Sequence, residues 1–271
     1  MDDYTASNRL HWNARTAINA ASAARYDIAG FLAGKSTLSP IELEELGEVT
    51  GKSLLHLQCH FGLDTLSWAR LGARVTGVDF ADEAIALADR LRQATGIDAQ
   101  FLCADIYALP QLLDETFDIV FTSGGVLCWL ADLDRWAEIV AHFLKPGGIF
   151  YLQDEHPFLN VFDDSPGVTN LRTRYPYFHT AEPLRIEGPL PHSDPASNQQ
   201  GVEYAWSYSF SDILNALLAA GLHLEFLHEF SHGRNRRFPF MRQGENGQWQ
   251  WQDPANAIPL TFSLQARKEY R

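Results

Sequence analysis

The feature that most constrains this chain is the regular alternation of short apolar runs with helix-type spacing between residues 51 and 156. Apolar runs predict five strands, at residues 53–58, 74–80, 99–106, 117–125 and 149–156. Segments with helical periodicity stand between them, at residues 63–72, 82–96 and 133–148. Strands alternating with helices at this spacing predict right-handed crossovers and a parallel sheet with helices on both faces. The strands are continuously apolar, as is typical of a sheet buried on both sides.

The flanking segments complete the expected architecture. Residues 1–50 are predicted to be helical, and residues 157–205 form an insertion after the fifth strand, over one end of the sheet. Residues 206–271 predict a last helix followed by strands at 222–230 and 258–268, which must be antiparallel because no helix joins them. We therefore expect one α/β domain over residues 1–271. Its doubly wound, Rossmann-like sheet has seven mostly parallel strands and an antiparallel C-terminal hairpin.

Charge and composition limit the kinds of partner that this chain is expected to bind. The chain carries 21 Lys+Arg against 34 Asp+Glu, a net charge of −13, which argues against nucleic acid as a partner. We interpret the one basic stretch, Arg234, Arg236 and Arg237, as a solvated loop. No apolar run reaches the roughly 18 residues of a membrane span, so we expect no membrane partner. The odd cysteine count and the polar N-terminus favour buried, reduced thiols in a cytoplasmic protein. The cysteines are Cys59, Cys103 and Cys128.

Candidate binding residues stand at the strand ends, where open parallel sheets bind ligands. The turn at 56–62 ends in Gly62, which would let a ligand approach the backbone. Asp79 ends the second strand, where a carboxylate can accept hydrogen bonds from ribose hydroxyls or cap a helix. Asp105 ends the third strand and could equally be a turn carboxylate. Thr122–Gly125 opens the loop after the fourth strand.

These segments resemble the motifs of class I S-adenosylmethionine-dependent methyltransferases. LLHLQCHFG lies where that family has V-L-D-x-G-x-G-x-G, and VTGVDF, CADIYALP and FDIVFTSGGVLCWL resemble its next three motifs. LKPGG and the strand after it resemble the segment around the family's fifth strand. The five segments have the family's order and spacing. The resemblance implies S-adenosylmethionine as cofactor, a small-molecule methyl acceptor, and an N-terminal segment that covers the cofactor.

The resemblance also implies site residues. Residues 51–156 would form the cofactor-binding core, and residues 157–205 would lie on the substrate side. The implied cofactor contacts are Trp12, Tyr26, Leu57, Gln58, Cys59, His60, Gly62, Asp79, Phe80, Ala104, Asp105, Ile106, Thr122 and Ser123. His56 replaces the family's motif-one aspartate, while Gln58 and His60 replace its first two glycines. We interpret Gln58 and His60 as residues that line the pocket.

Methyl transfer from a sulfonium mainly requires the protein to position two partners and, for some nucleophiles, to remove a proton. We predict His156, just past the fifth strand, as the base, with His60 second; either could be structural. No metal site is expected, because His228 and His232 lie in a strand-like segment. An aromatic group in and beside the insertion suggests an enclosed acceptor site or a satellite core. It comprises Tyr175, Tyr177, Phe178, His179 and Trp206.

Two other hypotheses fit parts of the sequence. A non-catalytic binding protein of the same fold would explain why the motif-one glycines are replaced. A nicotinamide-dependent oxidoreductase would also suit Asp79, but its phosphate-binding G-x-G-x-x-G is missing.

Overall fold

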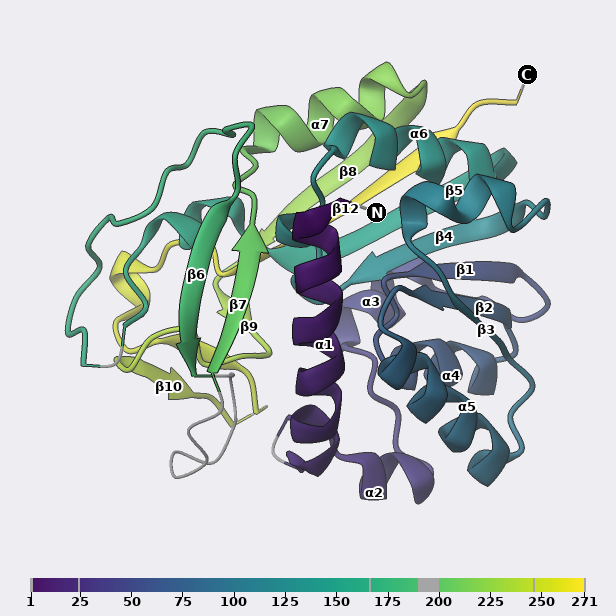
Figure 1. Cartoon of the computed structure of the whole chain (residues 1–271), viewed down its shortest axis with the longest axis horizontal. Helices are drawn as coiled ribbons and strands as arrows, with labels where there is room; N and C mark the ends of the chain where they lie inside the picture. The colour runs from purple at the N-terminus through teal and green to yellow at the C-terminus, as the bar shows by residue number, and fades with distance from the viewer. Residues whose placement is uncertain (1, 24, 166, 190–199, 246, 271) are drawn as a thin grey trace.

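The computed structural model describes residues 2–23, 25–165, 167–189, 200–245 and 247–270. A seven-stranded sheet with the order β3-β2-β1-β4-β5-β12-β8 forms its centre (Figure 1). Strands β1 to β5 pair in parallel, and β12 pairs antiparallel with both β5 and β8. The predicted α/β sheet is thus confirmed. Its strands are β1 (Ser53–Leu57), β2 (Arg74–Asp79), β3 (Gln100–Cys103), β4 (Phe117–Ser123), β5 (Leu144–Glu155), β8 (Leu222–Phe230) and β12 (Thr261–Lys268).

Helices cover both faces of this sheet. On one face, α4 (Leu63–Arg70) and α5 (Asp82–Thr95) pack on apolar residues of β1, β2, β4 and β5. On the other face, α6 (Leu133–Phe143) and α7 (Phe210–Ala219) pack on the alternate residues of these strands and on β12. Successive side chains of a strand point to opposite faces, so one run of apolar residues supplies both cores.

Two predicted boundaries are wrong. The helix expected over 133–148 ends at Phe143, and residues 144–148 begin β5 instead. The strand expected over 99–106 stops at Cys103, because the Asp105 side chain accepts the Tyr107 N–H and caps the 3-10 helix η1 (Ile106–Gln111). Strand β3 is the sheet's edge strand, which leaves Cys103 exposed rather than buried as expected.

The N-terminal segment is helical, as expected, with α1 (Asp3–Ala21), α2 (Ile28–Leu32) and α3 (Pro40–Leu46). Helix α1 stands beside the carboxyl ends of the strands (Figure 1). Asn13 donates to the Asp82 carboxylate at 2.8 Å, and Asn8 exchanges two hydrogen bonds with the Tyr204 backbone. These contacts hold α1 against the core on one side and against the insertion on the other. Among the described residues, no helix is long and apolar enough to cross a bilayer.

Two additions flank the sheet. The predicted insertion contains the 3-10 helix η3 (Pro157–Val161) and an antiparallel hairpin of β6 (Leu184–Pro189) and β7 (Gln200–Ala205). A second addition, residues 231–257, was not predicted. It lies between β8 and β12 and forms a small sheet that packs on η3. Its elements are β9 (His232–Gly233), β10 (Met241–Gln243), β11 (Trp249–Trp251) and η4 (Pro254–Asn256).

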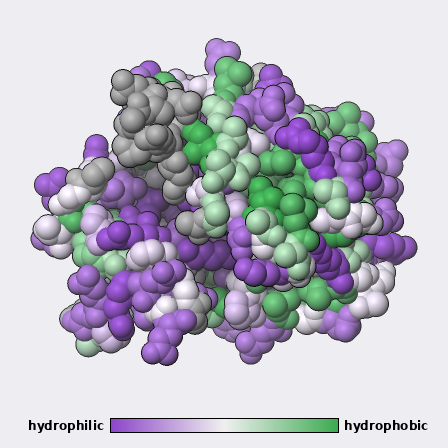
Figure 2. Space-filling view, turned by 90° about the horizontal axis from the view of Figure 1, so that it is seen from below, coloured by the Kyte–Doolittle hydropathy of each residue, from purple (hydrophilic) through white to green (hydrophobic). Residues whose placement is uncertain are grey.

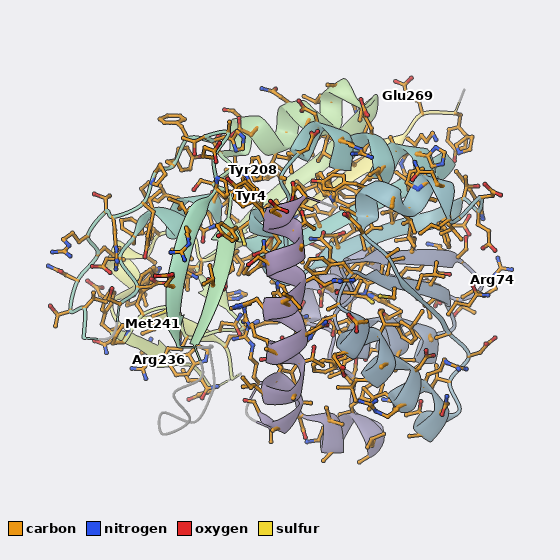
Figure 3. The ribbon with its side chains drawn as sticks, viewed as in Figure 1. Tyr4, Arg74, Tyr208, Arg236, Met241 and Glu269 are labelled. Atoms are coloured by element: carbon orange, nitrogen blue, oxygen red, sulfur yellow. The ribbon has the colours of Figure 1, made fainter. Side chains whose placement is uncertain are left out.

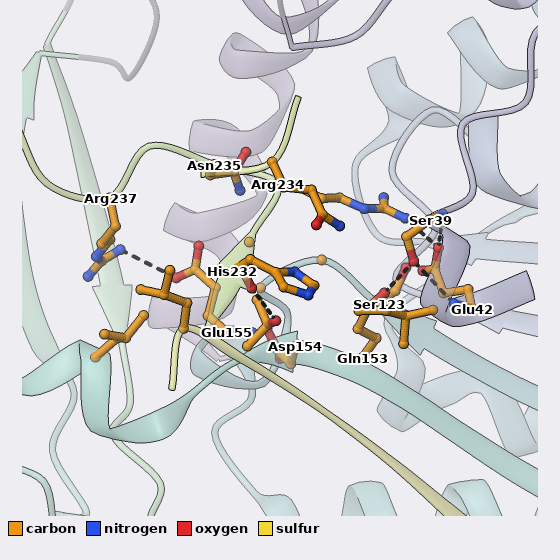
Figure 4. Close-up of a pocket in the computed structure, with 18 of the residues that line it drawn as sticks. Ser39, Glu42, Ser123, Gln153, Asp154, Glu155, His232, Arg234, Asn235 and Arg237 are labelled. Carbon is orange, nitrogen blue, oxygen red and sulfur yellow. Dashed lines mark hydrogen bonds and ion pairs between the residues drawn. The ribbon is translucent and has the colours of Figure 1, made fainter. Parts of the chain in front are cut away.

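The interpretation of the basic stretch as a solvated loop is wrong for two of its arginines. Arg234 forms ion pairs with Glu42 of α3 and with Asp64 of α4. Arg237 pairs with Glu155 at 3.5 Å, as Figure 4 shows, and with Asp164 at 3.2 Å. These pairs fasten the second addition to the core.

Replacing Arg234 with alanine should destabilise the fold by about 3 kcal/mol, because it leaves the fully buried Glu42 without its cation. Burial already raises the pKa of Glu42, and loss of the guanidinium raises it further. A raised carboxyl pKa makes stability fall as pH rises, so the loss should be larger at pH 8 than at pH 5. Urea unfolding at both pH values measures it. Arg74→Ala, at an exposed site, should change the free energy of unfolding little. A loss of stability as small as this in Arg234→Ala would contradict the role of Arg234 in pairing with Glu42.

Candidate functional site

A large cavity lined by described residues lies past the carboxyl ends of β1, β2 and β4. Its volume is about 710 Å³, and we call it the main cavity. Seen from below, the molecule is hollowed between the part built by β6, β7 and β10 and the body that carries α4 and α5, and hydrophilic residues gather in the hollow (Figure 2). Most of the predicted cofactor contacts line the main cavity: Trp12, Tyr26, Gln58, Cys59, His60, Gly62, Asp79, Phe80, Ala104, Asp105, Ile106 and Ser123.

Two predicted contacts do not reach this cavity. Leu57 and Thr122 are fully buried within their strands, and neither lines the cavity wall. Their neighbours Gln58 and Ser123 do. The reason is that adjacent side chains along a strand point to opposite sides of the sheet.

The backbone of the turn after β1 is strained at two residues that carry side chains. Gln58 and His60 have φ angles of 57° and 51°, the left-handed region that side-chain-bearing residues rarely adopt, at a cost of roughly 1–2 kcal/mol each. Three hydrogen-bond and packing contacts hold them there. The His60 N–H donates to Asp79 at 2.8 Å, the Gln58 amide donates to the Val126 carbonyl at 3.2 Å, and the His60 ring packs against Trp12. The turn thus keeps a glycine-type backbone at both positions, although neither residue is a glycine.

Gly62 remains a glycine for a steric reason. It has a φ of 75° at the start of α4, and a Cβ there would lie 2.6 Å from the Phe101 ring. No described side chain caps the start of this helix, and its first residues, Leu63 and Asp64, line the cavity wall with Gly62.

Asp79 is a buried carboxylate in the wall of the main cavity. It accepts the N–H groups of His60 and Ala81, at 2.8 and 2.9 Å. Burial raises its pKa to about 6, although these hydrogen bonds pull the pKa down. At neutral pH the group is therefore mostly ionised and keeps lone pairs for a further donor. Asp105, predicted as ligand contact or turn carboxylate, both lines the cavity and caps η1.

The two histidines predicted as bases occupy unsuitable settings. His60 lines the main cavity, but burial and the nearby charges of Arg15 and Arg25 lower its pKa to about 3, so it is a weak base. His156 lines neither the cavity described above nor the two cavities beside it described below. Its Nε2 lies 2.7 Å from a Glu229 oxygen, and its Nδ1 accepts the Phe158 N–H. His156 thus fastens η3 to β8, which is the structural role that the sequence left open beside a catalytic one.

Sequence reasoning missed Asp154, which precedes His156 by two residues at the end of β5. Its carboxylate is 5% exposed and accepts the N–H groups of Val126, Leu127 and Glu155. Burial raises its pKa to about 7. The only signal in the sequence was its place in an acidic run at a strand end.

A second cavity of about 380 Å³ lies beside the main one, and Asp154 is in its wall. We call it the side cavity. The β6–β7 hairpin and α1 contribute to its walls. Several residues line both cavities: Trp12, Arg25, Gly124, Gly125, Trp129, Asn235 and Arg236. The cavities therefore meet at this shared wall. A smaller cavity of about 60 Å³ lies next to both, between Ser39, Gln153 and His232 (Figure 4).

The aromatic residues predicted to enclose an acceptor separate into two groups. Tyr175 and Trp206 line the side cavity. Tyr177 instead joins the small core around η3, Phe178 is exposed, and His179 stacks on Tyr208. The satellite core thus accounts for Tyr177, and Tyr175 and Trp206 stay candidates for an acceptor site.

Comparisons with known proteins agree with this geometry. Residues 55–152 match the family model described as "Methyltransferase domain". A ubiquinone biosynthesis O-methyltransferase of Sinorhizobium fredii is 31% identical over 102 residues, 38% of this chain and 40% of that protein. The chain spans 40–50% of the length of such curated relatives.

Solved structures extend the likeness beyond that segment. An S-adenosylmethionine-dependent methyltransferase from Mesorhizobium loti has a TM-score of 0.57 at 23% identity, covering 88% of this chain and all of that one. A related structure from Listeria monocytogenes has a TM-score of 0.58 at 18% identity, covering 84% and 98%. The chain therefore has the fold of these solved methyltransferases, and its residues 55–152 are similar to a methyltransferase domain.

The strain at Gln58 predicts that glycine at this position is more stable than alanine, the reverse of the order expected in a helix. Gln58→Ala loses the amide hydrogen bond and keeps the left-handed strain, whereas Gln58→Gly loses the bond and relieves the strain. The glycine variant should therefore be more stable than the alanine variant by about 1 kcal/mol. Thermal unfolding measures the order. The same pair at Gln93, on α5, should show alanine more stable, as in an ordinary helix. Alanine more stable at both sites would contradict the strain.

Proposed function

We propose that this chain binds S-adenosylmethionine in the main cavity and transfers its methyl group to a small-molecule acceptor. The observation that carries the proposal is Asp79, a buried carboxylate at the tip of β2 that lines a cavity of about 710 Å³. A cavity of this size lies within the usual range for cofactor sites. The match to a methyltransferase domain supports the same function.

The residues present fit the cofactor. Asp79 would accept hydrogen bonds from the ribose hydroxyls, and Phe80 would pack on the adenine. Residues 104–106, where β3 gives way to η1, would meet the edge of the adenine. The backbone of the 58–62 turn and the uncapped start of α4 would face the methionine part. Gln58 and His60 keep a glycine-type backbone in this turn, and both residues line this wall.

Bound there, the sulfonium supplies an activated methyl group, so the protein mainly has to position the acceptor and exclude water. Trp12 and Trp129 pack edge to face at 5.3 Å on the shared wall of the two cavities and would screen the reacting centre from water. Gly124 and Gly125, both with positive φ, let the two ligands approach the backbone closely at this wall.

A protonated nucleophile would need a base, and Asp154 suits that role better than either histidine. It lies in the wall of the side cavity, directly beside the shared glycines, and its raised pKa is close to neutral. The curated relatives named as O-methyltransferases support a hydroxyl acceptor, whose proton Asp154 would take as the new bond to carbon forms.

The alternatives have less support. A nicotinamide cofactor needs a pyrophosphate next to the turn after β1, where the buried His60 ring stands among aromatic side chains. A non-catalytic role was suggested by the missing glycines, but the backbone of the turn keeps the conformation that those glycines would give.

Binding of S-adenosylhomocysteine should depend on pH through Asp79. Protonation removes the acceptor that ribose needs, so affinity should fall by up to about tenfold per pH unit below pH 6. Asp79→Asn should bind weakly and without this pH dependence. Calorimetric titration from pH 5 to pH 8 measures both. Asp89→Asn, on the outer side of α5, should behave as wild type, and a wild-type affinity that is flat over this range would contradict the role of Asp79.

Asp154→Asn should separate binding from catalysis. We expect S-adenosylhomocysteine affinity to change less than about threefold, while methylation of phenols falls about 100-fold or more, the usual contribution of a general base. In wild type the rate should rise with pH through about 7, because only the ionised carboxylate accepts a proton. Initial rates from pH 5.5 to pH 8.5 measure the profile. An unchanged rate and profile in the variant would exclude Asp154 as the base.

A further inference from the structure

We propose that the side cavity is the acceptor site and that it selects a small aromatic acid, whose carboxylate Arg15 binds. This inference rests on the proposed methyl transfer and names its substrate class. Three features of the molecule support it: the junction of the two cavities, the aromatic walls of the side cavity, and a buried cation.

The junction places the side cavity where an acceptor must be. A molecule in the side cavity and a cofactor in the main cavity would meet across the wall that both share, at Gly124 and Gly125. Neither glycine carries a side chain that would separate them. Methyl transfer needs contact between the nucleophile and the methyl carbon, and this junction permits it.

The walls of the side cavity favour a flat ring. Its volume of about 380 Å³ suits one aromatic ring with substituents. Aromatic side chains come from four parts of the chain: the N-terminal helix, the 126–130 loop, the insertion and the segment before α7. They are Trp12, Trp129, Tyr175, Trp206 and Tyr208. Stacked or edge-on contacts with such residues are the usual way of holding an aromatic ligand.

Arg15 supplies the buried cation. It projects from α1 into the wall of the side cavity and is 7% exposed, and its Nε has no hydrogen-bond partner among the described residues. Its guanidinium lies 4.3 Å from the centre of the Trp12 ring. In the described part of the chain it pairs with the carboxylate of Glu203, which is 3.9 Å from its NH1 but only 3.0 Å from His11. A buried charge so loosely paired is costly, and a ligand carboxylate would offset that cost.

Arg237 also lines this cavity, but it forms ion pairs with Glu155 and Asp164, so it is less available to a ligand. Asp154, at the tip of β5, lies in the same cavity wall as Arg15. An aromatic acid with its carboxylate on Arg15 could thus direct a ring hydroxyl toward Asp154 and the shared glycines.

The test compares two ligands that differ in one charge, 4-hydroxybenzoate and 4-hydroxybenzamide. Calorimetric titrations are run with and without saturating S-adenosylhomocysteine. The acid should bind at least tenfold more tightly than the amide. Arg15→Gln should remove this preference by weakening acid binding at least tenfold, with amide binding unchanged. Arg15→Lys should retain part of it, because the charge stays but the planar fork is lost.

Controls make each outcome decisive. Arg74→Gln, at the start of β2 and far from Arg236 in Figure 3, should bind both ligands as wild type. S-adenosylhomocysteine binding by the Arg15 variants reports that they are folded. Equal binding of acid and amide, or tighter binding of the cationic tyramine, would overturn the inference. If wild type does not bind S-adenosylhomocysteine, the proposed function is overturned instead. The titrations of acid and amide alone then still decide whether the side cavity prefers the acid.

Discussion

The hydrogen bond from the His60 N–H to the Asp79 carboxylate is the interaction on which this site depends. It joins the turn after β1 to the tip of β2, at the point where the proposed cofactor would lie. The bond holds His60 in a left-handed conformation that its side chain disfavours, and it offsets part of the burial that raises the pKa of Asp79. The site thus stores strain in the backbone and an electrostatic cost in the carboxylate. Strain of this kind persists only where the surrounding structure overdetermines it, and it often marks a functional site.

The rest of the chain encloses this turn. Helix α1 brings Trp12 and Arg15 over the strand ends, and hydrogen bonds anchor it to α5 and to β7. The second addition closes another side, because Arg234 ties it to α3 and α4. The outcome is a pair of connected cavities, one mainly built by the sheet and its turns and the other by α1 and the insertion. This division suits a reaction in which a common cofactor meets a particular acceptor, since the core can stay constant while the additions set specificity.

Local patterns predicted the sheet and the positions of Asp79 and Asp105, because strand ends and helix starts depend on neighbouring residues. The site's long-range contacts were out of reach. Arg234 meets partners 192 and 170 residues away, so its stretch read as a solvated loop. The left-handed backbone at Gln58 and His60 was also hidden, because these residue types rarely adopt it. His156 was preferred over Asp154 for its chemistry, whereas burial and cavity position distinguish them only in three dimensions.

In the proposed function, a motif-one turn without its first two glycines still forms an adenosyl site. Calorimetric titration of the wild-type chain with S-adenosylmethionine and S-adenosylhomocysteine, with NADH in parallel, tests it most directly. The account predicts micromolar binding of both adenosyl ligands at one site per chain, and no binding of NADH. Absence of heat from either adenosyl ligand at millimolar concentration would contradict it, because the Gln58 and His60 side chains would then have closed the site.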